Sequence, residues 1–250
     1  LFDRTTRRVQ LTAIGRSFAR KASHVLDELE GTLLGITEVA STRQGEITIA
    51  CLISIAPYAL PQILRTYAER FTGVRVRIID EDANNVLATV ASGEAEFGID
   101  VLETREPSID FHPLRRERFI AVLQHTHPLA TRKSIKWSEL SAERLMTIDK
   151  TNVSRLLLDN ALATTARRPY WMFEARLSST LLGLAEAGLG IALVPELSFA
   201  QVHPGLLAVP IVGPSIRRHV GLITRRGHRL APNAQHLFQM IDEYFRAANT

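Results

Sequence analysis

Apolar residues recur every three or four positions between residues 14 and 40. This spacing predicts one long helix over residues 12–41, about 45 Å in length, with Thr12 placed to cap its start. A core helix of a larger domain and an exposed rod that pairs with a second chain both fit the pattern. We favour the rod, because residues 42–45 separate it from the rest of the chain. The stripe consists of Ile14, Phe18, Ala22, Val25, Leu29, Leu33, Ile36 and Ala40.

An exposed rod with such a stripe would leave a large apolar surface in water. Pairing with the same helix of another chain would bury that surface on both subunits. We therefore expect a homo-oligomer. The predicted dimer contacts are Phe18, Val25, Leu29, Leu33 and Ile36.

Short strand-like and helix-like stretches alternate along the rest of the chain. The first five predict β-α-β-α-β, and therefore a parallel sheet covered by helices; they are residues 46–52, 57–71, 74–80, 84–92 and 95–101. Residues 104–107 and Pro113 predict irregular chain. Further strands are predicted at 118–124, 145–148, 170–175, 190–194, 206–210 and 219–224, and helices at 154–165, 179–187 and 232–247. The predicted fold class is α/β, with two α/β units after the linker helix.

The composition is that of a soluble globular protein. The 250 residues are 46% hydrophobic and 22% charged, enough for one large or two small domains. No apolar stretch reaches the roughly 18 residues of a membrane span, and the polar, basic first ten residues do not resemble a signal peptide. Cys51 is the single cysteine, which excludes a disulfide within the chain. We therefore expect a cytoplasmic protein without a membrane partner.

Positive charge is concentrated at the amino-terminal end. The whole chain has a formal net charge of +4, whereas residues 1–22 contain six basic side chains and one aspartate, which leaves +5. This asymmetry indicates a nucleic-acid or phosphate contact at that end. The alternative is a solvated, charged turn. The candidate phosphate contacts are Arg4, Thr5, Thr6, Arg7 and Arg8.

Enzymatic and metal chemistry are not indicated. The sequence has no G-x-S-x-G elbow, P-loop, H-E-x-x-H or complete G-x-G-x-x-G, and we expect no catalytic residues and no cofactor. His125 and His127 form an H-x-H pair, but no nearby Cys, Asp or Glu cluster completes a metal site. Cys51 is predicted to be a buried structural thiol.

An ordered set of motifs resembles the LysR-type transcriptional regulators. Residues 1–22 are similar to the wing and the start of the linker helix of that family. The later landmarks are FTGV (71–74), SGEAEFGI (92–99), HPLA (127–130) and AGLGIALVP (187–195), and Tyr58 to Pro61 resembles the helix after the first strand. The set covers essentially the whole chain.

The resemblance implies a DNA-binding regulator that senses a small molecule allosterically. Residues 1–11 would be the wing of a winged helix-turn-helix, residues 12–41 the dimerising linker helix, and residues 42–250 an effector-binding domain with the type 2 periplasmic-binding fold. Lobe I would comprise about 45–116 and 221–250, and lobe II about 117–220. The expected partners are DNA, through the full-length protein, a small effector and further copies of the chain, as a dimer or tetramer. The helices that enter the major groove are expected to be absent from this chain. The alternative function is solute binding for uptake.

The candidate effector site follows from strand ends. In open α/β sheets ligands bind at the carboxyl ends of strands, where helix N-termini point. Each hydroxyl there could instead cap a helix. Helix N-termini, hydroxyls and an amide can hold an anion without an arginine, so we expect a small organic acid. The candidate residues are Leu52, Ile53, Ser54, Ile55, Asp100, Val101, Thr151, Asn152, Ser154, Ser178 and Ser179.

Overall fold

The computed structural model describes residues 1–5, 8–12, 14–15, 18–19, 21–22, 45–101, 106–163, 169–200 and 203–247. The chain begins with an antiparallel hairpin of β1 (Phe2–Thr5) and β2 (Arg8–Leu11), in which Thr5 lies opposite Arg8. Thr12 follows, and its Oγ1 accepts a hydrogen bond from the Gly15 N–H at 3.0 Å, which confirms the predicted cap.

Only the start of the predicted linker helix lies within the described residues. Residues 14–15, 18–19 and 21–22 are helical, and the Phe18 side chain is exposed. The other four predicted dimer contacts, Val25, Leu29, Leu33 and Ile36, lie outside the described residues. The helix as a whole therefore stays a prediction.

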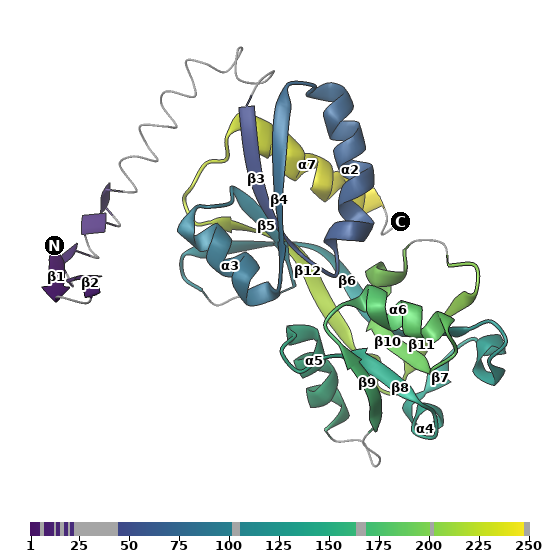
Figure 1. Ribbon diagram of the computed structural model, residues 1–250. Helices are drawn as coiled ribbons and strands as arrows, with labels where there is room; N and C mark the ends of the chain where they lie inside the picture. Colours follow the sequence, from purple (N-terminus) through teal and green to yellow (C-terminus); the bar gives the residue numbers. More distant parts are fainter. Residues whose placement is uncertain are drawn as a thin grey trace.

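The first lobe is a sheet covered by helices on both faces (Figure 1). Alternate side chains of β3 explain this arrangement: Ile47, Ile49 and Cys51 pack under α2 and α7, whereas Ala50 packs under α3. As predicted, β3 is parallel to both neighbours, β4 and β5, and β12 closes the order β4-β3-β5-β12 antiparallel to β5. The elements are β3 (Gly45–Leu52), α2 (Ala56–Arg70), β4 (Val74–Glu81), α3 (Ala83–Ser92), β5 (Phe97–Asp100), β12 (Arg217–Arg225) and α7 (Pro232–Ala247).

The second lobe repeats this plan. Phe119, Ala121 and Leu123 of β6 face α5, whereas Ile120 and Val122 face α6. Strands β10, β8 and β9 are parallel to one another, and β10 and β11 both lie antiparallel to β6. The elements are β6 (Ile109–Gln124), η1 (Pro128–Thr131), β7 (Ile135–Lys136), α4 (Trp137–Leu140), β8 (Leu145–Ile148), α5 (Val153–Leu162), β9 (Trp171–Ala175), α6 (Ser178–Glu186), β10 (Ile191–Pro195), η2 (Glu196–Phe199) and β11 (Leu206–Val212).

Strands β6 and β12 run between the lobes. The first half of β6 pairs with β12, and the second half pairs with β10 and β11. The expectation of irregular chain at Pro113 was wrong, because this residue lies inside β6. Proline is tolerated there since β6 forms the edge of the lobe I sheet and the register shifts between Val220 and Gly221, opposite Pro113.

Among the described residues, no helix has the length and apolar content that crossing a membrane would require.

Candidate functional site

A buried arginine joins two of the predicted site residues from opposite lobes. Arg218 donates from Nη1 to Ser54 Oγ at 3.1 Å and to Ser154 Oγ at 2.9 Å. All three residues are buried, with exposed fractions of 2% for Arg218, 6% for Ser54 and 2% for Ser154. The predicted lobe I and lobe II hydroxyls therefore meet at one guanidinium group.

The same arginine forms a buried ion pair with Glu117. Arg218 Nε lies 2.6 Å from Glu117 Oε2, and both side chains are essentially inaccessible to water. The other carboxylate oxygen, Oε1, accepts the Leu197 N–H at 2.6 Å. Burying two charges is tolerable only when they are paired and hydrogen-bonded, and both conditions hold here. We refer to Ser54, Glu117, Ser154 and Arg218 as the Arg218 cluster.

The topology explains how the cluster assembles. Ser54 lies in the turn after β3, and Ser154 lies in the first turn of α5, so both follow the carboxyl ends of parallel strands, β3 and β8. Glu117 and Arg218 lie opposite each other in the register of β6 and β12, the strands between the lobes. The cluster thus occupies the junction where strand ends from both lobes converge.

Further contacts bring the lobes together around the cluster. Ser198 Oγ donates to the Ser54 carbonyl at 3.4 Å, and Val153 of lobe II packs on the lobe I core. At the rim, Arg176 Nη2 lies 4.0 Å from Asp82 Oδ2, an exposed and therefore weak ion pair. The two lobes are in contact at the site.

Among the buried donors without a hydrogen-bond partner, one lies in the Arg218 cluster and one at the start of α6. They are Arg218 Nη2 and the hydroxyl of Ser178, the first residue of α6. A buried donor that is left unpaired costs free energy, so each position favours an incoming acceptor. This feature distinguishes Ser178 from its neighbour Ser179, which is exposed.

The other predicted lobe II residues have local roles. Asn152 caps α5, since its Oδ1 accepts the Ser154 N–H at 2.9 Å. Thr151 is exposed, and both its N–H and its hydroxyl donate to Asp149 Oδ1.

The other predicted lobe I residues are mostly inside the core. Leu52, Ile55 and Val101 are buried in the lobe I core, and Ile53 is half-buried beside them in sequence. Asp100 is fully buried, and its Oδ1 accepts the Val101 N–H at 2.6 Å.

Sequence reasoning missed the arginine and the glutamate. The expected strands began at residues 118 and 219, one residue after Glu117 and Arg218. A signal was present, because extending the alternation of Leu222 and Val220 by one more step places Arg218 on the same buried side. A charged residue on the buried face of a strand implies a partner or a ligand.

The remaining candidates for site chemistry have structural roles. Cys51 is fully buried, and burial together with nearby Asp100 and Asp80 raises the pKa of its thiol well above the ordinary value. The described residues contain no cluster of His, Cys, Asp and Glu suited to a metal ion. His127 instead caps η1, where its Nδ1 accepts the Leu129 N–H at 3.2 Å.

Three of the five predicted phosphate contacts lie on the amino-terminal hairpin. Arg4 and Thr5 belong to β1 and Arg8 to β2, whereas Thr6 and Arg7 lie outside the described residues.

Comparison with known proteins gives one consistent family. The profile of the LysR substrate binding domain matches residues 40–246. An HTH-type transcriptional regulator of Escherichia coli strain K12, YbhD, is 34% identical over 242 residues, which cover 96% of this chain and 76% of the relative. The Corynebacterium glutamicum OxyR C206 mutant superposes with a TM-score of 0.71 at 25% identity, over 99% of this chain and 79% of that one. The effector binding domain of QuiR in complex with shikimate has the same fold, with a TM-score of 0.69 at 18% identity over 82% and 98% of the two chains.

Proposed function

This chain belongs to the LysR family of transcriptional regulators, and from that premise we propose that its effector is a small organic acid held at the Arg218 cluster. The comparisons support a ligand-sensing transcriptional regulator, and uptake of a solute is not favoured. The acid would bind between the lobes and change the balance between two arrangements of the protein.

The observation that carries the proposal is the unpartnered Nη2 of Arg218. This donor is buried, whereas Nε and Nη1 of the same guanidinium are already bonded to Glu117 and to the two serines. A carboxylate is the acceptor that best fits a buried guanidinium, because charge-assisted hydrogen bonds are the strongest. The Ser178 hydroxyl would supply a second donor from lobe II.

The charge of the cluster fits a single acidic group. Glu117 balances Arg218, so the cluster is neutral before a ligand arrives. Helix N-termini of α5 and α6 contribute partial positive charge at the same sheet edge, which favours a monoanion. The expected apolar contacts, Leu52 and Ile55, lie inside the core, so we assign the non-polar part of the ligand to half-buried Ile53. QuiR, which shares this fold, was solved with shikimate, a carboxylate.

We also propose a role for each segment of the chain. Residues 1–11 would form the wing, whose Arg4, Thr5, Thr6, Arg7 and Arg8 contact DNA phosphates without reading sequence. Residues 12–41 would form the dimerising linker helix, and residues 42–250 the effector-binding domain, in a cytoplasmic dimer or tetramer without catalytic activity. Lobe I would comprise about 45–116 and 221–250, and lobe II about 117–220.

The ligand class can be tested by calorimetry with matched pairs of compounds. Shikimate, butyrate and benzoate, each a monocarboxylate, would be titrated beside the corresponding neutral amide. The proposal predicts that at least one acid binds and that its amide binds about tenfold or more weakly, since the amide lacks the charge. Equal binding of acid and amide would contradict it.

The site itself can be tested with neighbouring serines of α6. Replacing buried Ser178 by alanine, Ser178→Ala, should weaken binding of that acid by about threefold to tenfold, because a hydrogen bond is lost. Ser179→Ala is the matched control and should leave the affinity within about twofold. If the two variants bind the acid with equal affinity, Ser178 is not part of the site.

A further inference from the structure

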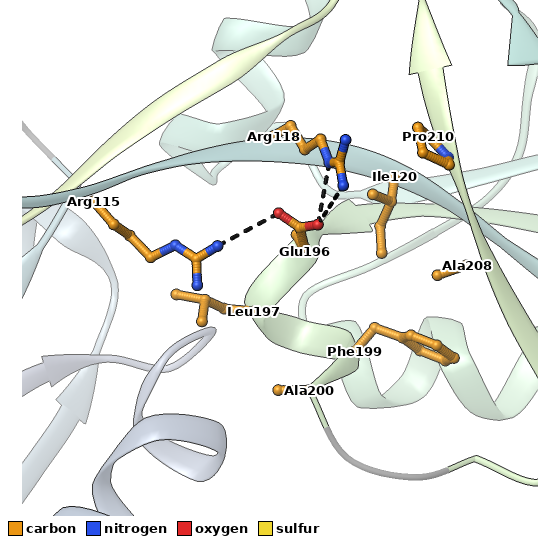
Figure 2. A pocket seen from close by; sticks show the side chains of 9 residues that line it. All are labelled: Arg115, Arg118, Ile120, Glu196, Leu197, Phe199, Ala200, Ala208 and Pro210. Carbon is orange, nitrogen blue, oxygen red and sulfur yellow. Dashed lines mark hydrogen bonds and ion pairs between the residues drawn. The ribbon is translucent and has the colours of Figure 1, made fainter. Parts of the chain in front are cut away.

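A pocket lies beside η2 on lobe II. Its volume is about 300 Å³, and side chains from β6, η2 and β11 line it (Figure 2). Of the residues that the structure describes, those lining this pocket include no member of the Arg218 cluster. The pocket is therefore a separate place in the fold.

Two arginines and one glutamate form the polar side of the pocket. Arg118 donates from Nε and Nη2 to Glu196 Oε1 at 3.1 and 2.8 Å, and Arg115 Nη2 lies 3.6 Å from Glu196 Oε2 (Figure 2). The three side chains leave one excess positive charge. Arg115 Nε is buried without a hydrogen-bond partner, so this guanidinium has an unused donor.

Most of the remaining lining of the pocket is apolar. Ile120, Phe199, Ala208 and Pro210 form it, and the Phe199 ring is drawn well apart from the two arginines in Figure 2. A bare inorganic ion would leave these side chains without a partner. A cavity of about 150 Å³ holds a benzene-sized molecule, so this pocket has room for one ring with an attached charged group.

We propose that this pocket is a second ligand site for a small monocarboxylate with a ring or short-chain apolar body. The carboxylate binds Arg115 and Arg118 and competes with Glu196 for them. The apolar body packs against Ile120, Phe199 and Pro210. The ligand therefore needs one negative charge at one end and an uncharged, apolar group at the other.

The position of η2 connects this pocket with the Arg218 cluster. Glu196 and Phe199 line the pocket, whereas the Leu197 N–H bonds to Glu117 and Ser198 Oγ bonds to the Ser54 carbonyl. A ligand that displaces Glu196 therefore acts on η2, whose Leu197 and Ser198 contact Glu117 and Ser54 of the cluster. This regulatory consequence rests on the proposed function of the cluster, whereas binding at the pocket does not.

The proposal can be tested with 4-fluorobenzoate as the probe and fluorine NMR as the readout. Ala208→Trp fills the pocket from β11, where Ala208 is exposed, and should abolish probe binding at this site. Arg115→Gln should raise the dissociation constant about tenfold or more, because a charge-assisted contact is lost. Arg116→Gln is the matched control, because it removes an exposed charge from the same strand. It should leave the dissociation constant of the probe within about twofold of the parent value.

Variants of the cluster separate the two sites. With Arg218→Lys, binding to the pocket should persist, and 4-fluorobenzamide should fail to bind there in every variant. Loss of all probe binding in Arg218→Lys, with none lost in Ala208→Trp, would place the probe at the Arg218 cluster. That result would overturn the pocket proposal and leave the proposed function of the cluster intact. Absence of binding to the parent protein at about 10 mM probe would overturn the pocket as well, since a carboxylate paired with arginine in a fitted pocket should bind more tightly.

Discussion

Arg218 and Glu117 stabilise the protein only as a pair. Each is buried, and each has hydrogen bonds to further groups besides its partner. Arg218→Met should lower the free energy of unfolding by about 3–5 kcal/mol, because Glu117 would keep a buried charge without its counter-ion. Urea unfolding measures this change.

The double variant is the control for this interpretation. Arg218→Met with Glu117→Leu removes both charges and should recover most of the lost stability, since an apolar pair of similar volume needs no counter-ion. A double variant as unstable as the single one would show that the hydrogen bonds to the serines, rather than the ion pair, dominate.

Cys51 should be unreactive in the folded protein. Its thiol is fully buried, and burial first, then Asp100 and Asp80, raises its pKa, so little thiolate is present at neutral pH. Labelling with a chromogenic disulfide should be complete within seconds in denaturant and at least about a hundredfold slower in the native state. Rapid labelling of the native protein would show that the Cys51 thiol is not buried.

The raised pKa of Cys51 has a consequence for stability. The folded state disfavours the thiolate, whereas the unfolded chain ionises near pH 8.5. The contribution of the protonated Cys51 thiol to the free energy of unfolding is therefore fully present below about pH 8.5 and declines as the pH rises above that value. Cys51→Ala should flatten the loss of stability between about pH 8.5 and 10, measured by urea unfolding, and an unchanged slope would contradict the assignment.

At the scale of elements, the crossing of β6 and β12 depends on a glycine. A Cβ at Gly221 would lie 2.3 Å from Phe111 Cζ and 2.7 Å from the His112 carbonyl oxygen. Gly221→Ala should therefore destabilise the protein by about 2 kcal/mol or more, measured by thermal unfolding. Gly183→Ala in α6, where nothing lies within 4 Å, should instead stabilise it by about 0.5–1 kcal/mol. The explanation requires that Gly221→Ala lowers the stability of the protein and that Gly183→Ala raises it.

Periodicity predicted the regular elements well and the crossing strands only partly. The helix at 232–247 and the strand at 145–148 were predicted with the bounds that the structure has. The first half of β6 was not predicted, because Pro113 and several charged residues interrupt its alternation. Its strand conformation comes from pairing with β12, which is remote in sequence and leaves no local signal.

At the scale of the molecule, the site depends on contacts between distant segments. The sequence indicated Ser54 and Ser154 because strand ends can be located from pattern alone. It did not indicate the arginine between them, since residues 54, 154 and 218 meet only after both lobes have folded and packed. The same holds for the pocket beside η2, whose arginines and apolar wall come from three separate segments.

The central claim is that an acid binds the free donor of Arg218 between the lobes. Arg218→Lys keeps the positive charge beside Glu117 but removes Nη2, and Arg217→Lys makes the same change at the exposed neighbour on β12. Calorimetry with the acid that binds the parent protein should give a dissociation constant raised about tenfold or more by Arg218→Lys and within about twofold for Arg217→Lys. A folded Arg218→Lys variant that binds the acid as tightly as the parent would contradict the account.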